Sequence, residues 1–271
     1  MSQVFKDATY YREQLRDIHT FMLDLDGTFY LGDQLYPWSI PFIQKLKRLG
    51  KQFIFVTNNS SRSARYYTAK ILRMGLEIET NQVFTSGEAT IHFLQKNNIP
   101  QRVYLLGTHD LEEEFISRGY QLTSHHPAAV VLGFDLTLTY EKLQTACTLI
   151  RSGVPFIATH PDFNCPTPTG PIPDCGAMTA FITAATGVNP KVIGKPHPEM
   201  VEALCTRFNL ERQHVAMVGD RLYTDIAMGQ AAGIKSILVL SGETQREDLE
   251  NSPFQPDLVA AHLGEIADWL S

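Results

Sequence analysis

The chain has 271 residues, with 44% apolar and 19% charged side chains, which is ordinary for a folded globular protein of one large domain or two smaller ones. Its mild net charge of −6, with no basic cluster denser than residues 45–48, argues against a nucleic-acid-binding protein. Residues 1–16 hold no unbroken apolar stretch, and no apolar run reaches the roughly 18 residues of a membrane span, so we expect a soluble, cytoplasmic protein that does not act at a membrane.

Short apolar runs alternate with amphipathic segments, which predicts βαβ units and a parallel sheet. Gly50 and Gly75 follow two of the amphipathic segments, where a glycine suits the end of a helix. From the N-terminus onward, we predict strands at 21–26, 52–56, 102–106, 129–132, 155–158, 191–193, 215–218, 236–240 and 257–260. We predict helices at 38–49, 62–74, from 86, and at 110–117, 140–151, 178–185, 198–208, 224–232 and 263–270, with a Pro/Gly-rich loop at 161–173.

The residues that suggest chemistry occur near positions 24, 57, 195 and 220. The stretch of about a hundred residues between the second and third of these positions has its own strands and helices, enough for a separate core. We therefore predict an α/β fold with a parallel-sheet domain at 1–82 and 187–271 and a separate, smaller α/β domain inserted at 83–186.

The strongest chemical signal is the segment Asp24-Leu25-Asp26-Gly27-Thr28, directly after an apolar strand. Because side chains alternate along a strand, Asp24 and Asp26 begin on the same side, at the sheet edge where open α/β folds bind ligands. Two carboxylates this close repel each other unless a cation or a proton lies between them, and Mg²⁺ is a hard cation that meets this need. The alternative is a plain acidic turn.

The second signal is Gly219-Asp220, which again places a carboxylate after a strand, with Asp225 in the first turn of the next predicted helix. A carboxylate at that position also suits the positive end of a helix dipole, so Asp225 alone could be a structural residue. Together with Asp24, these residues favour a shared cation site.

Two weaker signals come from Thr57-Asn58, after the second strand, and from Lys195, after the strand at 191–193. A hydroxyl and backbone amides between a strand and a helix can cradle phosphate, and a lysine there can balance a carboxylate and a phosphate together. Alone, the first is an ordinary turn and the second a solvated loop residue.

The four segments, in this order, resemble the motifs of the haloacid dehalogenase superfamily of phosphotransferases. The long insertion between the second and third motifs is similar to the large cap of its NagD and p-nitrophenylphosphatase-like group. The resemblance covers residues 21–62 and 191–242. It implies that the domain at 1–82 and 187–271 is a doubly wound, Rossmann-like catalytic core and that the inserted domain at 83–186 is a cap. It also implies a magnesium-dependent phosphatase for small phosphomonoesters such as sugar phosphates or nucleoside monophosphates, with p-nitrophenyl phosphate as an artificial substrate.

The same resemblance implies a role for each motif residue. Asp24 would attack phosphorus to form an aspartyl-phosphate, and Asp26 would act as general acid and then general base. Thr57 and the Asn58 amide would hold phosphate oxygens, while Lys195 would neutralise charge. The Mg²⁺ ligands would be Asp24, the Asp26 backbone carbonyl and Asp220, with Asp225 acting through water or as a more distant support. Residues 28–37 resemble the mobile flap of the family.

The cap should select the substrate, and its best candidates are His160, Asp162 and Asn164, directly after a predicted strand. Related chains often begin this loop with Asn where this one has His160. That histidine could bind an anionic or hydroxyl-rich leaving group, or it could be an ordinary loop residue. The expected partner is a small phosphorylated metabolite, and the cap could pair with a second copy to form a homodimer.

Two other functions stay open at this point. One is a catalytically silent protein that binds phosphometabolites, although such a protein has no need of Asp26. The other is a phosphotransferase or mutase of the same superfamily. Those enzymes usually carry a smaller cap after the first motif, which this chain does not have.

Overall fold

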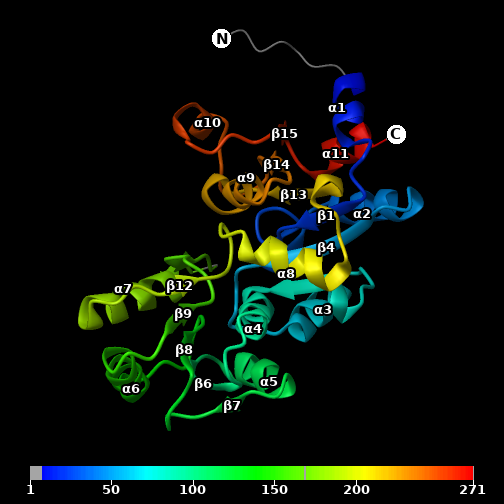
Figure 1. The fold of residues 1–271 in the computed structure, drawn as a ribbon. Coiled ribbons are helices and arrows are strands. Elements are labelled where there is room, and N and C mark those ends of the chain that lie inside the picture. The colour runs from blue at the N-terminus through cyan, green and yellow to red at the C-terminus, as the bar shows by residue number, and fades with distance from the viewer. Residues whose placement is uncertain (1–7, 168, 271) are drawn as a thin grey trace. The chain divides into compact units, whose positions relative to one another are not determined.

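The chain divides into two compact units in the computed structural model, which describes residues 8–167 and 169–270 (Figure 1). Residues 1–7 of the N-terminal segment discussed above lie outside the described residues. The predicted cap at 83–186 falls within the range of the second unit, and the division into core and cap domains stays a prediction. The first unit comprises Met1–Val56, Ile71–Ile78 and Cys205–Ser271, and the second comprises Thr57–Lys70 and Glu79–Leu204.

The first unit contains a parallel sheet, a small hairpin and several helices. Its strands are β1 (Thr20–Leu23), β2 (Tyr30–Leu31), β3 (Gln34–Leu35), β4 (Gln52–Thr57, whose last residue begins the second unit), β13 (Val215–Gly219), β14 (Lys235–Val239) and β15 (Leu258–Ala260). Its helical segments are α1 (Ala8–Leu15), α2 (Ser39–Arg48), η2 (Arg212–His214), the π-helical turn η3 (Leu222–Ile226), α9 (Ala227–Ala232), α10 (Asp248–Asn251) and α11 (Leu263–Trp269).

The sheet of the first unit has the order β15-β14-β13-β1-β4, and each of these neighbours is parallel. From the centre, the connection β1-α2-β4 runs in one direction and the connection β13-α9-β14 runs in the other. Crossovers of this kind are right-handed, so the two connections place their helices on opposite faces of the sheet. The order therefore reverses between β1 and β13, which is the point where doubly wound sheets bind ligands.

The central strands are apolar because both faces of the sheet are covered. All four residues of β1 are buried, and Phe21, Met22 and Leu23 have no exposed surface. α11 packs against α2 and α1, and the rings of Tyr11 and Trp269 stack at 4.2 Å between centroids. Figure 1 shows α1 and α11 side by side, so the two ends of the described chain lie together.

The second unit has its own parallel sheet in the order β12-β9-β8-β6-β7. The strands of this unit, of which β5, β10 and β11 lie outside that sheet, are β5 (Val83–Thr85), β6 (Arg102–Leu106), β7 (Gln121–Leu122), β8 (Ala129–Leu132), β9 (Phe156–Ala158), β10 (Asn164–Cys165), β11 (Ile172–Pro173) and β12 (Lys191–Val192). Its helical segments are η1 (Thr80–Gln82), α4 (Ser86–Lys96), α5 (His109–Ser117), α6 (Tyr140–Arg151) and α7 (Cys175–Thr186), and α3 (Ala64–Arg73) and α8 (Glu199–Phe208) cross the division between units.

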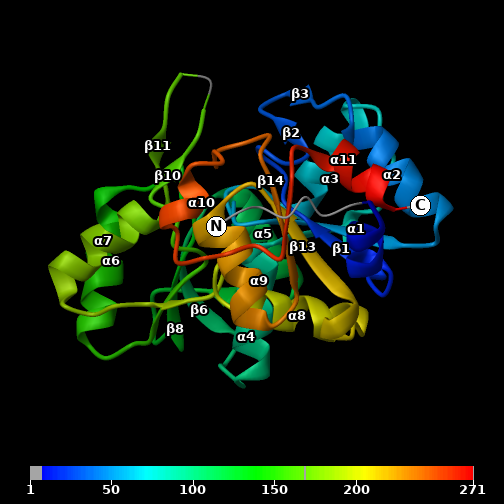
Figure 2. The ribbon, with the colours of Figure 1, turned by 90° about the horizontal axis from the view of Figure 1, so that it is seen from above.

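A separate hydrophobic core holds the second unit together. Side chains of β8, β9, α6 and α7 form it, including Leu132, Phe156, Ile150 and Ile182. The antiparallel hairpin β10-β11 leads into α7 and, in Figure 2, extends away from α6 and α7.

The predicted fold class is confirmed: the chain has an α/β fold with a doubly wound, Rossmann-like core. Several segments differ from the expectation: α1, β2, β3, β5 and β7 were not predicted, and β1 ends at Leu23 rather than near Asp26. The loop predicted at 161–173 contains β10 and β11, and α7 begins at Cys175 rather than at 178 because Asp174 caps it. Within the described part of the chain, no helix is long and apolar enough to cross a membrane.

Candidate active site

Three of the predicted carboxylates meet at the switch point of the first unit. Asp24 follows β1, and Asp220 follows β13, whose Val218 lies opposite Leu23 of β1. Asp225 reaches the same place from η3. The carboxylates of Asp24, Asp220 and Asp225, which we call the acidic cluster, each offer an oxygen within 4.8 Å of the others.

The backbone packs closely around the acidic cluster, and glycines make this possible. A Cβ atom added at Gly27 would lie 2.3 Å from Asp220 Oδ2, and one at Gly242 would lie 2.0 Å from the same atom. A Cβ at Gly219 would lie 2.2 Å from the carboxyl carbon of Asp225. Gly27 also has a φ of +86°, which favours glycine. Close packing on both carboxylates limits how far they can turn away from Asp24.

Hydrogen bonds hold the same carboxylates in place. Asp220 Oδ2 accepts from the backbone N–H of Glu243 at 2.7 Å, and its Oδ1 accepts from the Thr28 hydroxyl at 3.4 Å. Asp225 Oδ2 accepts from the backbone N–H of Arg221 at 3.2 Å. With 2% exposure for Asp220 and none for Asp225, two negative charges are fixed in a poorly hydrated place.

Arg221 supplies positive charge beside the acidic cluster. Its Nε lies 2.9 Å from Glu243 Oε2. Burial lowers the pKa of Arg221, but the charges of Asp24 and Glu243 outweigh this and raise it overall, so the guanidinium stays charged. One guanidinium does not balance three clustered carboxylates and Glu243 together.

The acidic cluster therefore fits a divalent cation. Its donors are all carboxylate oxygens, which are the ligands that hard cations such as Mg²⁺ prefer. A dication would relieve the repulsion among three carboxylates that the fold holds together.

Asp26 lies next to this cluster in the first unit. It is partly buried, and its backbone forms an isolated bridge with Tyr30, at the start of the β2-β3 hairpin. Burial and the charges of Asp220 and Asp26 raise the pKa of Tyr36, so its hydroxyl stays protonated. That hydroxyl donates to the Ser241 carbonyl at 2.8 Å, which ties the end of the hairpin region to the loop after β14.

The other predicted phosphate-binding residues gather in the second unit. Thr57 ends β4, and its hydroxyl accepts from the Asn59 backbone N–H at 3.2 Å. Asn58 Oδ1 accepts from the backbone N–H of Lys195 at 2.8 Å, and Asn58 Nδ2 donates to the Lys195 carbonyl at 2.9 Å. The side-chain amide of Asn58 thus holds the Lys195 backbone through both its oxygen and its nitrogen.

His160 lies beside this pair, between two carboxylates. Its side chain is fully buried, with Nδ1 3.5 Å from Asp162 Oδ2 and Nε2 3.5 Å from Asp174 Oδ1. Asp162 also accepts from Asn58 Nδ2 at 3.2 and 3.1 Å. Asn164, in contrast, is exposed at the start of β10. The structure therefore brings the predicted residues together in two sets, one in each unit.

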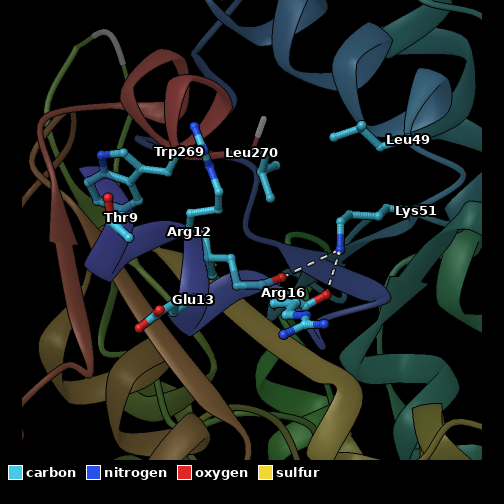
Figure 3. A pocket seen from close by; sticks show the side chains of 9 residues that line it. Thr9, Arg12, Glu13, Arg16, Leu49, Lys51, Trp269 and Leu270 are labelled. Carbon is cyan, nitrogen blue, oxygen red and sulfur yellow. Dashed lines mark hydrogen bonds between the residues drawn. The ribbon is translucent and has the colours of Figure 1, made fainter. Parts of the chain in front are cut away.

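A pocket of about 430 Å³ in the first unit lies away from these residues (Figure 3). Arg12, Arg16, Lys51 and Trp269 are among the residues that line it. The Lys51 amino group donates to the carbonyls of Leu15 and Arg16 at 3.4 and 3.5 Å, as the dashed lines in Figure 3 show. Lys51 precedes β4, so this pocket is at the strand end opposite the acidic cluster, and none of the predicted site residues lines it.

Two charged residues of these sets were not predicted. Arg221 directly follows Asp220, so its position beside a predicted metal ligand was a signal that could have identified it. Asp174 stands at the N-cap of α7, where Asp is common for structural reasons, and nothing local marks it as a partner of His160.

Comparisons with known proteins cover both units. Residues 21–121 match a haloacid dehalogenase-like hydrolase family model, and residues 192–266 match an HAD-hydrolase-like model. The dihydroxyacetone phosphatase of Corynebacterium glutamicum is 34% identical over 92% of this chain and 90% of its own length.

Two solved structures show how far the similarity extends. The 4-nitrophenylphosphatase of Thermotoga maritima is 48% identical with a TM-score of 0.92, covering 95% of this chain and 99% of that one. The glycerol phosphate phosphatase of Mycobacterium tuberculosis, in complex with magnesium, is 31% identical with a TM-score of 0.86, covering 93% of this chain and 77% of that one.

Proposed function

We propose a reaction scheme for this chain on the premise that it belongs to the haloacid dehalogenase-like hydrolase family, in its NagD and p-nitrophenylphosphatase-like group, and is a phosphoric monoester hydrolase. Asp24 attacks the phosphorus of a small phosphomonoester, and the bond to the ester oxygen breaks while Asp26 donates a proton to that oxygen. The alcohol leaves, and the phosphoryl group stays on Asp24.

In the second step Asp26, now a carboxylate, takes a proton from water. The resulting hydroxide attacks the phosphorus of the aspartyl-phosphate, which releases inorganic phosphate and restores Asp24. Thr57 and the Asn58 backbone amide hold phosphate oxygens, and the Lys195 ammonium balances the charge that Asp24 and phosphate bring together. Phosphoryl transfer of this kind depends mainly on positioning and on charge stabilisation.

We infer that the divalent cation is Mg²⁺, held by Asp24, Asp220 and the Asp26 carbonyl, with Asp225 beside them. The ion, when bound, would offset negative charge on the phosphate and on the carboxylates that surround it. The magnesium complex of the mycobacterial relative and the all-oxygen acidic cluster support this choice.

The observation that carries the proposal is the acidic cluster at the switch point. Asp24 and Asp220 come from two central strands that are nearly two hundred residues apart in the sequence, yet both follow the strands at the same sheet edge. A structural turn would not need three buried or partly buried carboxylates together with three close-packed glycines around them.

The test is hydrolysis of p-nitrophenyl phosphate by Asp24→Asn, measured with Mg²⁺ present. We expect kcat to fall by roughly 10⁴-fold or more, because the nucleophile of the covalent step is lost. Asp268→Asn, an exposed aspartate on α11, is the matched control and should keep wild-type activity. Undiminished turnover by Asp24→Asn would refute the scheme.

For the substrate we propose small sugar or polyol phosphates. The names of the relatives from Corynebacterium glutamicum and Mycobacterium tuberculosis, a dihydroxyacetone phosphatase and a glycerol phosphate phosphatase, support this class. The segment containing His160, Asp162 and Asn164 would select among such substrates. A screen of phosphorylated metabolites, nucleoside monophosphates included, would identify the preferred one by release of free phosphate.

We also propose that the enzyme works in the cytoplasm, where small phosphorylated metabolites are found, and that two copies associate through the cap. Cell fractionation tests the first proposal, and the molar mass of the full chain in solution tests the second, since a monomer would contradict it.

A further inference from the structure

His160 is a buried titratable residue to which the reaction scheme gives no chemical step. Its ring has no exposed surface, and its two nitrogens face different carboxylates, Asp162 and Asp174, at 3.5 Å each. Neither nitrogen makes an aligned hydrogen bond within the described part of the chain, so these contacts act mainly through charge. A neutral ring placed there would offer no positive charge to the buried Asp174 and the partly buried Asp162, which is costly.

Charge favours the protonated ring. Burial lowers the pKa of His160, but the charges of Asp174 and Asp162 outweigh burial and the charge of Lys195 and raise it. The pKa of the Asp162 carboxyl is lowered by the histidine and by Asn58, although burial acts in the opposite direction. Cys175, which lies beside them, has a pKa raised to about 12 by burial and stays neutral. His160 and Lys195 thus balance Asp162 and Asp174.

The backbone around the ring is closely packed. A Cβ at Gly194 would lie 2.6 Å from the Thr159 carbonyl, 2.7 Å from Asn58 Oδ1 and 2.9 Å from His160 Cβ. The loop after His160 is tied to the start of α7, because Gly176 donates its N–H to the Asp162 carbonyl at 2.8 Å. Because this region has little free space, a movement of the Asp162 side chain should also move Asn58, which is hydrogen-bonded to it.

We propose that His160 is a positioning residue for phosphate recognition: its imidazolium, held between Asp162 and Asp174, orients Asp162 so that Asn58 holds the backbone of Lys195. This inference rests on the proposed function, in which Asn58 and Lys195 bind phosphate. His160 thus acts through Asp162 and Asn58, and it does not contact the leaving group directly. Loss of the imidazolium would leave Asp162 and Asp174 facing an uncharged side chain, and the contact of Asn58 with the Lys195 backbone would loosen.

The test measures inhibition by inorganic phosphate and the KM for p-nitrophenyl phosphate in His160→Gln. We expect both constants to rise on the order of tenfold or more, the scale expected from misplaced binding groups, with a smaller change in kcat. His109→Gln is the control, because that histidine is in the same unit and its side chain is 79% exposed. Equal constants in His160→Gln and wild type would overturn the proposal.

Two further variants, Asp174→Asn and His160→Gln/Asp174→Asn, distinguish a role of His160 in positioning Asp162 from a general contribution to stability. Asp174→Asn keeps a side chain that caps α7 but leaves His160 with one carboxylate, so it should also weaken phosphate binding. The double variant His160→Gln/Asp174→Asn removes one charge of each sign and should bind phosphate better than the two single effects predict together. Strict additivity, or changes confined to thermal stability, would contradict the proposal.

Two further outcomes are decisive. In wild type, phosphate inhibition should weaken as pH rises through the pKa of His160, beyond the change seen in His160→Gln, because only the wild type loses an imidazolium. A bound metal that wild type holds and His160→Gln lacks would overturn the proposal, since a metal ligand must be a neutral ring. Full activity in Asp24→Asn would instead refute the reaction scheme and leave these binding measurements interpretable.

Discussion

Close packing, as well as charge, determines where the carboxylates of the acidic cluster can point. Gly242 lies on the loop after β14, and Gly27 on the turn after β1, and both approach the same oxygen of Asp220. Neither glycine is near Asp220 in the sequence. Asp24 and Asp220 could be predicted because each follows an apolar strand, and Asp225 because it lies near the start of the next predicted helix. The role of Gly242, in contrast, depends on a contact made only in the folded chain.

We predict that Gly242→Ala impairs catalysis, by displacing Asp220, without unfolding the protein. The new methyl group would lie 2.0 Å from Asp220 Oδ2, so either the carboxylate or the loop must move. A displacement of this size should lower kcat/KM on the order of 100-fold, measured with p-nitrophenyl phosphate. Gly153→Ala, where a Cβ meets nothing within 4 Å but the φ of +94° strains the backbone, adds strain without a clash and should leave kcat/KM unchanged. Similar kinetics in the two variants would show that Asp220 is not held by packing.

At the scale of the elements, the contact between α5 and the segment that leads into β7 buries a polar group without a hydrogen bond. Tyr120 is 3% exposed and packs edge-on against Phe115 of α5, with 5.2 Å between ring centroids. Its buried hydroxyl has no hydrogen-bond partner among the residues that the structure describes. Burial raises the pKa of Tyr120 to about 12. The ring therefore stabilises this contact, while the hydroxyl opposes it.

We predict that Tyr120→Phe increases the free energy of unfolding by about 1 kcal/mol near neutral pH, because an unsatisfied buried hydroxyl is removed. The difference between the variant and wild type should grow as pH rises from 10 towards 12. In that range the unfolded tyrosine loses its proton and the folded one keeps it, so wild-type stability falls. Urea denaturation across this range measures the effect, with Tyr140→Phe, at 76% exposure, as the control. A destabilised variant would mean that the hydroxyl has a partner.

For the whole molecule, the alternation of strands and helices was sufficient to predict a parallel sheet, and the resemblance to the haloacid dehalogenase superfamily added its doubly wound order. Buried strands such as β1 are continuous apolar runs, and glycines mark the ends of several helices, so the alternation is visible locally. The compact second unit was harder to delimit, because Thr57–Lys70 joins it through contacts distant in sequence, such as that of Asn58 with Lys195. The partnership of His160 with Asp174 was missed for the same reason.

The acidic cluster also predicts how metal should affect the stability of the whole chain. Folding brings Asp24, Asp220 and Asp225 together, and the unfolded chain does not, so a cation that binds them favours the folded state. Mg²⁺ at about 100 times its dissociation constant should add roughly 2.7 kcal/mol to the free energy of unfolding. Removal of Mg²⁺ by a chelator should abolish both this gain and hydrolysis.

Asp220→Asn separates this specific effect from a general effect of salt. The variant should be less sensitive to Mg²⁺ in urea denaturation, since one of the three carboxylates is neutral, while Asp268→Asn should respond as wild type does. Sodium chloride at matched ionic strength should reproduce little of the gain, because screening acts weakly on buried charges. An equal response to Mg²⁺ in Asp220→Asn and wild type would place the cation elsewhere and remove the basis for assigning Asp24 as the nucleophile beside it.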